Sequence, residues 1–262
     1  MRATLVVPTL NEAESIGPVL RSFRTAAVEA NRGIWASDPI DWEILVVDGA
    51  STDGTGERAR AEGARVIVER QKGYGRAYQT GFAAARGDYI ATSDGDATYP
   101  VETIPALLRR LVDERYDFLS GNRLAYLDRR AMTTEHRIGN RMLNLFLHVA
   151  YHHYLAAAEG GRLEDSQSGF WIFRRSILEQ IHPREDGMAF SEELKIEVLL
   201  QGLRFVEVPI HYGERWGRPK LSSWRDGFGN MLFLYRKRIA IAQAERERRL
   251  AHAADTGRTR PG

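Results

Sequence analysis

The chain contains no cysteine among its 262 residues. This absence excludes disulfide bonds, thiolate metal sites and a cysteine nucleophile, and it fits a reducing compartment. The chain also has no uninterrupted apolar run that approaches the ~20 residues of a membrane-spanning helix. Residues 1–4 run directly into an expected strand, which leaves no room for a signal peptide. We therefore expect a cytoplasmic protein, and peripheral attachment to the cytoplasmic face of a membrane stays open.

A strong excess of charge is missing as well. The formal net charge is +2 and the pI is near 8.9, a balance that does not indicate a nucleic-acid partner. Hydrophobic residues make up 43% of the chain, enough for a sizeable core. Neither an internal repeat nor a linker is evident, so we predict one domain over residues 1–227. An amphipathic helix and a disordered tail follow over residues 228–262, with the tail starting after about Glu245.

Short apolar runs of strand length alternate with helical patterns in the first hundred residues. The runs are Thr4–Pro8, Trp42–Asp48, Arg65–Glu69 and Tyr89–Ser93. This alternation predicts parallel βαβ units with helices on both faces of the sheet. Ligands bind such sheets outside the carboxyl ends of the strands. Because Pro8–Glu12, Asp48 and Asp94–Thr98 all follow strands, we expect them to form one site.

The second half is less regular. Its expected strands are Phe118–Gly121, Trp171–Phe173 and Phe205–Pro209, and its expected helices are Val101–Val112, Arg137–Ala157, Ser191–Gln201 and Phe228–Ala244. Residues 216–223 are rich in Gly, Pro, Lys and Ser, which predicts a mobile flap.

Asp94, Gly95 and Asp96, here called the acidic loop, end the fourth strand. Two carboxylates in such a place are costly unless a positive charge lies between them. A divalent cation that carries a phosphorylated ligand would supply it, since hard cations prefer carboxylate and phosphate oxygens. The alternative is that both acids are solvated turn residues.

Other polar residues have two interpretations. Thr9 with Glu12, or Asn11 with Glu14, has the spacing of a helix capping box. His148 and His152 lie four residues apart on an expected helix, but no third metal ligand is evident, so interfacial or core histidines are favoured. In the last helix, Met231, Phe233 and Leu234 beside residues 236–238 could lie on a membrane surface or pack against the domain.

Three motifs resemble the family 2 glycosyltransferases of the GT-A fold. They are Val7–Glu12, Val46–Thr55 and Asp94–Asp96. Four later motifs resemble the branch of dolichyl-phosphate mannose synthases and polyprenyl-phosphate glycosyltransferases. They are Ser120–Arg123, Asp165–Phe170, Val206–Ile210 and Arg215–Leu221. The resemblance covers roughly residues 4–225. It implies an α/β, Rossmann-like, mostly parallel mixed sheet with helices on both faces, the nucleotide-diphospho-sugar transferase fold.

The resemblance also implies roles for individual residues. The donor base and ribose would lie against Pro8, Leu10, Glu12, Val46 and Asp48, with Asp94 and Gly95 on the ribose side. Asp96 and Thr98 would bind Mg²⁺ or Mn²⁺, although many members have Gln where this chain has Thr98. The phosphates of donor and acceptor would be held by Arg123 and Arg137, and Arg215 and Lys220 would form a cationic flap over the diphosphate. Pro219 replaces the small hydroxyl residue that usually precedes that lysine.

The implied reaction is an inverting, metal-dependent transfer of a hexose from a GDP-mannose or UDP-glucose type of donor to a polyprenyl or dolichyl phosphate. A lipid phosphate is already ionised and needs positioning, for which arginine is well suited. Arg137, near Arg130 and Arg141, leads an apolar helix along which a polyprenyl tail could lie; the alternative is a core helix with a solvated basic end.

Two further functions stay open. With a soluble or other hydroxyl acceptor, Glu192 or Glu193 becomes the candidate general base, unless these acids only stabilise a helix N-terminus. A protein that binds nucleotide sugar without turnover is the alternative from another class. The departures at Thr98 and Pro219 favour it, and the intact Asp94, Asp96, Arg123 and Arg215 argue against it.

Overall fold

The computed structural model describes residues 1–127, 134–216 and 223–258. Within this part, seven strands form one sheet in the order β3-β2-β1-β4-β6-β5-β7. Their bounds are β1 Arg2–Thr9, β2 Asp41–Asp48, β3 Arg65–Val68, β4 Tyr89–Thr92, β5 Phe118–Leu127, β6 Trp171–Arg174 and β7 Phe205–Tyr212. Only β6 runs against the direction of its neighbours. The predicted mostly parallel mixed sheet is therefore confirmed.

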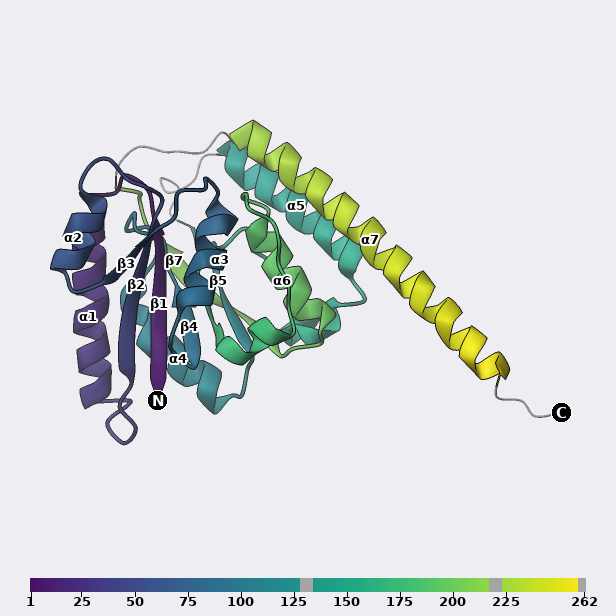
Figure 1. Cartoon of the computed structure of the whole chain (residues 1–262), viewed down its shortest axis with the longest axis horizontal. Coiled ribbons are helices and arrows are strands. Elements are labelled where there is room, and N and C mark those ends of the chain that lie inside the picture. The colour runs from purple at the N-terminus through teal and green to yellow at the C-terminus, as the bar shows by residue number, and fades with distance from the viewer. Residues whose placement is uncertain (128–133, 217–222, 259–262) are drawn as a thin grey trace.

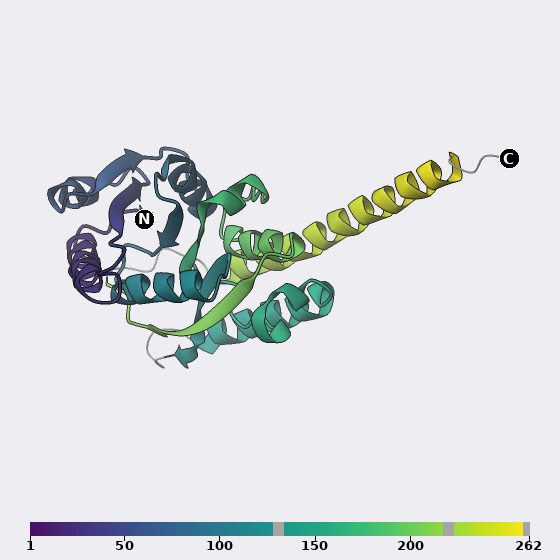
Figure 2. The same ribbon diagram turned by 90° about the horizontal axis from the view of Figure 1, so that it is seen from below.

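Helices cover both faces of the sheet (Figures 1 and 2). They are α1 Ile16–Arg32, α2 Thr55–Ala61, α3 Tyr74–Ala84, α4 Ile104–Asp113, α5 Thr134–Tyr151, α6 Phe190–Leu200 and α7 Ser223–Arg258. Short 3₁₀ turns lie at Val101–Thr103, Leu155–Ala157, Glu159–Gly161 and Arg175–Glu179.

Alternating side chains of the inner strands build two separate cores. In β1, Leu5 and Val7 pack with α1 and α4 on one face, whereas Val6 packs with α3 on the other. The second core also contains buried residues of α5, α6 and α7, including Leu147 and Leu234. Strands that are buried on both faces account for the continuous apolar runs in the sequence.

The chain order creates a switch point between β1 and β4. After β1 the chain adds β2 and then β3 on one side, and it returns to place β4 on the other side of β1. The carboxyl edge of the sheet at such a switch point is where ligands bind in open α/β sheets.

Three elements differ from the sequence prediction. β5 continues to Leu127 because its second half pairs with β7 after an irregularity between Asn122 and Tyr126. Helix α5 ends at Tyr151 instead of Ala157. Helix α7 extends to Arg258, beyond Glu245, and disorder of the tail stays a prediction. Whether residues 1–227 form the domain without α7 stays a prediction.

Helix α7 is anchored on the body over its first half and projects from it over its second half (Figure 1). Leu234 is completely buried, and its carbonyl accepts a hydrogen bond from the Tyr151 hydroxyl at 2.8 Å. Lys237 forms an ion pair with Glu193 at 3.0 Å. Among the described residues, no helix is long and apolar enough to cross a membrane.

Candidate functional site

The loops after β1, β2 and β4 meet at the carboxyl edge of the sheet, as predicted. Thr9 pairs with Asp48 in the parallel register of β1 and β2, and Val6 pairs with Thr92 of β4. The next residues of all three strands therefore leave the sheet side by side.

The loop after β1 is fastened to the loop after β2. The amide of Asn11 donates to Ser51 Oγ at 2.8 Å, and Asn11 Oδ1 accepts from the Thr52 amide at 2.9 Å. The Glu12 amide donates to Thr55 Oγ1 at 2.8 Å. Asn11 adopts a φ of 50°, a left-handed conformation that asparagine tolerates. The capping-box interpretation is wrong: α1 starts after Ser15, with no side-chain cap.

The residues expected to hold a base and a ribose are only partly brought together. Pro8, Leu10 and Asp48 reach the carboxyl edge, and Asp48 Oδ1 accepts a hydrogen bond from the Ser51 amide at 2.9 Å. Val46 is different, because its side chain is fully buried in the core on the α1 face. Any contact between Val46 and a ligand at this edge would have to come from its backbone.

The acidic loop packs closely against the loop after β1. A Cβ atom at Gly95 would lie 2.5 Å from Glu12 Oε2 and 2.6 Å from Thr9 Cγ2, so only glycine fits there. The Gly95 carbonyl accepts a hydrogen bond from Ser15 Oγ at 2.7 Å. These contacts bring Glu12 to the loop that carries Asp94 and Asp96.

Asp96 is completely buried, and its two carboxylate oxygens have different surroundings. Oδ1 accepts from the Thr98 amide at 3.0 Å and from the Thr98 hydroxyl at 2.6 Å. Oδ2 accepts no hydrogen bond and forms an ion pair with Arg215 Nη2 at 2.5 Å. Thr98 therefore orients Asp96 in this structure, and metal ligation by Thr98 stays a prediction.

Asp94 lies beside Asp96 and accepts a hydrogen bond from the Tyr78 hydroxyl at 3.3 Å. Burial raises the pKa of Asp94 well above its ordinary value. The neighbouring charges of Asp96 and Glu12 add to this effect, and those of Arg215 and Arg123 oppose it. The loop thus concentrates more negative charge than its two arginines offset, which is the condition for recruiting a cation.

Arg215 reaches Asp96 because the segment after β7 is joined to the acidic loop. The Gly213 amide donates to the Thr98 carbonyl at 2.9 Å, and the Trp216 amide donates to the Asp96 carbonyl at 3.0 Å. The ion pair raises the pKa of Arg215 against the opposing effect of burial. The start of the predicted flap is therefore at the site, while Lys220 lies outside the described residues.

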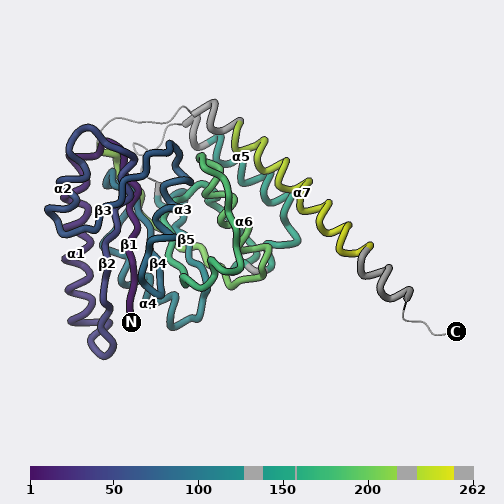
Figure 3. Tube along the Cα trace, in the orientation of Figure 1, coloured from purple at the N-terminus to yellow at the C-terminus, as the bar shows by residue number. Residues whose placement is uncertain are grey.

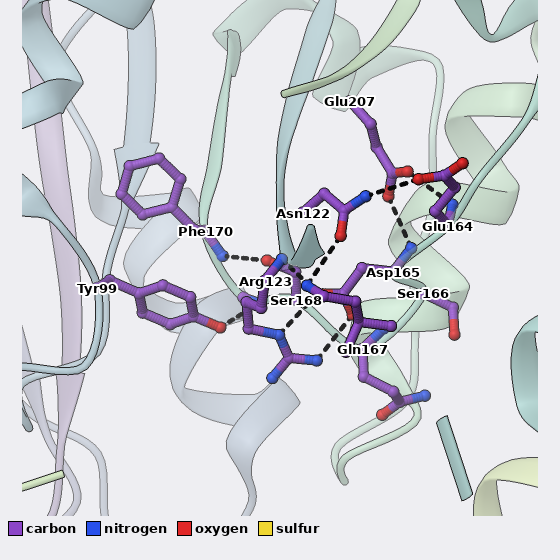
Figure 4. A network of polar contacts seen from close by, with 12 residues as sticks. Tyr99, Asn122, Arg123, Glu164, Asp165, Ser166, Gln167, Ser168, Phe170 and Glu207 are labelled. Carbon is purple, nitrogen blue, oxygen red and sulfur yellow. Dashed lines mark hydrogen bonds and ion pairs between the residues drawn. The ribbon is translucent and has the colours of Figure 1, made fainter. Parts of the chain in front are cut away.

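Arg123 is buried and is held by a residue for which the sequence predicted no role. Its Nε and Nη2 atoms each donate to the carboxylate of Asp165 at 2.8 Å, and its amide donates to the same carboxylate at 2.9 Å (Figure 4). Burial works to raise the pKa of Asp165, but Arg123 outweighs it, so that pKa lies below its ordinary value. The guanidinium also lies 5.4 Å from the ring centroid of Tyr212.

A second layer of charge supports the Arg123–Asp165 pair. Lys195 is fully buried and donates to the Asp165 carbonyl. Burial lowers the pKa of Lys195 to about 8, although Asp165 and Glu207 oppose this shift. Glu207 accepts the amides of Glu164 at 2.6 Å and Asp165 at 3.0 Å (Figure 4), and burial raises its pKa to about 6. The motifs Ser120–Arg123, Asp165–Phe170 and Val206–Ile210 were the sequence signals for this network, and Lys195 had none.

Glu192 and Glu193 start α6 in different environments. Glu193 accepts the amides of Arg184 and Glu185, both at 2.7 Å, and pairs with Lys237. Glu192 is completely buried, and burial raises its pKa well above the ordinary value. Glu193 is thus occupied by an ion pair and two amides, whereas Glu192 Oε2 accepts no hydrogen bond, and a general-base role for either stays a prediction.

Arg137 lies near the start of α5, but its side chain is outside the described part of the structure. Of the apolar residues expected beside it, Leu143 and Leu147 are buried in the core and Phe146 packs against it. Leu145 is exposed. One side of this helix is therefore core, and binding of a polyprenyl tail along the exposed side stays a prediction.

The residues at the acidic loop fit a divalent cation that is also bound by its ligand. Among the described residues, no three His, Cys, Asp or Glu side chains are arranged to hold a metal by themselves. Mg²⁺ commonly uses only one or two carboxylates together with substrate phosphates and water. Asp96 Oδ2 accepts no hydrogen bond and lies against the guanidinium of Arg215, so it suits that role, with Asp94 beside it.

Comparisons with known proteins agree on one family. The family model described as Glycosyl transferase family 2 matches residues 4–182. The low-salt glycan biosynthesis hexosyltransferase Agl6 of Haloferax volcanii is 34% identical over 88% of this chain, and the match covers 52% of Agl6. The chain thus spans about half the length of that relative. The dolichyl-phosphate hexose transferase of the same organism is 33% identical, with 85% of this chain and 88% of that protein covered.

Solved structures with the same fold include glucosyl-3-phosphoglycerate synthase from Mycobacterium tuberculosis in complex with Mn²⁺, UDP and phosphoglyceric acid. The TM-score is 0.64 and the sequence identity 22%, with 88% of this chain and 78% of that chain covered. At this identity the likeness concerns the fold alone.

Proposed function

Because the chain belongs to glycosyl transferase family 2, we propose that it moves a hexose from a nucleotide-diphosphate sugar, of the GDP-mannose or UDP-glucose type, to a polyprenyl or dolichyl phosphate. The transfer inverts the anomeric carbon and uses Mg²⁺ or Mn²⁺. The observation that carries this proposal is the acid pair of Asp94 and the buried Asp96 at the switch point, with Arg215 placed directly on Asp96.

The donor nucleotide occupies the carboxyl edge between β1 and β4 in this proposal. Pro8, Leu10, Glu12 and Asp48 lie against its base and ribose, and Asp94 faces the ribose side. The rigid fastening between the loops after β1 and β2 supports this assignment, since a preorganised cradle loses little entropy on binding.

The demanding step is the departure of the nucleoside diphosphate, on which negative charge grows in an oxocarbenium-like transition state. A divalent cation held by Asp96 supplies Lewis-acid stabilisation of that charge. Arg215 and Lys220 act on the same diphosphate from the flap, and Asp165 keeps Arg123 oriented with its positive charge directed at the acidic loop. Loss of one preorganised contact of this kind typically costs about 3–4 kcal/mol of transition-state stabilisation.

A phosphate acceptor suits this site better than an alcohol. A lipid phosphate attacks without being deprotonated, so the transfer needs no general base, whereas an alcohol acceptor would need one. By resemblance Arg137, at the start of α5, binds the acceptor phosphate. The curated relatives named for dolichyl-phosphate and dodecaprenyl-phosphate chemistry support the same acceptor class.

The test is transfer of label into lipid. The purified chain is incubated with labelled nucleotide sugars and Mg²⁺ or Mn²⁺, with and without a polyprenyl phosphate, and the organic extract is counted. We expect lipid label that depends on the polyprenyl phosphate and disappears with excess EDTA. Label found only in a water-soluble product would show that the acceptor is soluble and not a lipid. Binding of the nucleotide sugar without any transfer would show that the protein is a binding protein and not an enzyme.

A further inference from the structure

Helix α5 carries a row of large apolar side chains that face solvent. Ile138, Met142, Leu145 and Val149 follow one another at intervals of four, three and four residues, which places them on one side of the helix. Each is between 55% and 70% exposed. Single exposed apolar residues are ordinary, but a contiguous row indicates a binding surface.

Helix α7 adds a second exposed row beside the first. Leu232, Tyr235 and Ile239 are spaced by three and four residues and are 37% to 55% exposed. The helices lie side by side (Figures 1 and 3), with Arg238 Nε donating to the Ala150 carbonyl at 2.8 Å. Leu234 turns toward the core. We call these seven exposed residues the α5–α7 outer face.

This assignment differs from the one predicted for the last helix. Leu234 is buried, and Met231 and Phe233 pack against the same core, so none of the three is free to enter a membrane. Lys237, one of the predicted basic residues, is paired with Glu193 and Glu197. The exposed apolar residues that α7 adds to the outer face are Leu232, Tyr235 and Ile239, and α5 supplies the other four residues of that face.

Charge around the outer face has one sign. Residues 138–154 and 228–244 contain no Asp or Glu, whereas Arg141 and Arg236 are exposed. In a symmetric contact between two copies, the same surface would meet itself and bring these arginines together without acidic partners. An anionic surface would instead complement them.

We propose that the α5–α7 outer face rests on the surface of an anionic phospholipid bilayer, with its apolar rows at the level of the acyl chains and its arginines among the headgroups. Helices of this pattern bind in the plane of the membrane interface. In Figure 1 the N-terminal ends of α5 and α7 lie toward the carboxyl edge of the sheet, so docking would bring the site to the membrane surface. Docking would deliver a lipid-borne acceptor to the site, and this purpose rests on the proposed function. The docking itself does not depend on that function.

The experiment is flotation of the full chain with vesicles of phosphatidylcholine, with or without phosphatidylglycerol. We expect binding to the anionic vesicles that weakens as salt increases. Leu145→Glu combined with Val149→Glu should reduce partitioning at least about tenfold, because each substitution removes a buried apolar side chain from the membrane-bound state. Val28→Glu is the matched control: Val28 is 45% exposed on α1, away from this face, and its substitution should leave binding unchanged.

Two results would overturn the proposal. One is equal vesicle binding by the double variant and the wild-type chain. The other is a wild-type chain that ignores anionic vesicles but forms dimers in sedimentation experiments, which the double variant loses; the face would then join two copies. Transfer to a short-chain prenyl phosphate without vesicles separates this proposal from the proposed function. Its absence from a wild-type chain that binds vesicles would contradict the function alone.

Discussion

At the scale of single residues, the site depends on partners that are distant in sequence. Asp96 meets Arg215, and Arg123 meets Asp165, over separations of more than forty residues. The acidic loop, Arg123 and Arg215 could be singled out from the sequence because their types and motifs indicate phosphate and metal chemistry. Their partners could not, since a contact such as Arg123–Asp165 depends on how β5 and the turn before β6 are placed in the sheet.

The Arg123–Asp165 pair makes a prediction about stability. Asp165→Asn leaves a buried guanidinium without its counter-charge, so we expect the free energy of unfolding at neutral pH to fall by about 3–5 kcal/mol. Denaturant titrations of the wild-type and variant chains measure the difference.

The pH dependence of that difference has a defined sign. The pKa of Asp165 is lower in the folded chain than its ordinary value of 3.8. Its stabilising contribution is therefore present above about pH 4 and is lost as the pH falls through the folded-state pKa. The gap between the two chains should narrow below pH 4. A gap that widens in acid would contradict the pairing.

At the scale of elements, hydrophobic periodicity was enough to place the strands and most helices to within a few residues. The exceptions have physical causes. Polar Asn122 and Arg123 interrupt the apolar sequence of β5, and the residues after them continue the strand through their pairing with β7. For the last helix, the sequence left open whether the apolar residues pack against the domain or lie on a membrane surface. Periodicity alone does not distinguish those that enter the core from those that stay exposed.

Helix α7 therefore provides a paired test. Leu234 is fully buried and Leu232 is 37% exposed on the same helix. We expect Leu234→Ala to lower the free energy of unfolding by about 2–5 kcal/mol, the usual cost of a buried leucine. Leu232→Ala should change it by only about 0.5 kcal/mol. Equal effects in denaturant titrations would show that α7 does not pack on the body, and that residues 1–227 form the domain without it.

At the scale of the whole molecule, the order of the strands decides where chemistry takes place. The return of the chain from β3 to β4 puts the acidic loop opposite the loop after β1, and β7 leads Arg215 to the same edge. The α5–α7 outer face is a separate, exposed surface on helices α5 and α7. The sequence predicted the first arrangement through its alternating elements, whereas the outer face became recognisable only from side-chain exposure.

The central claim is that Asp96 holds a divalent cation for a nucleoside diphosphate at this edge. The most direct measurement is calorimetric titration of GDP and UDP into the wild-type chain and Asp96→Asn, each with Mg²⁺ and with EDTA. We predict that Mg²⁺ strengthens the binding of one nucleotide to the wild-type chain at least about tenfold, or about 1.4 kcal/mol, and that Asp96→Asn abolishes this gain. The same metal-dependent gain in both chains would contradict the claim.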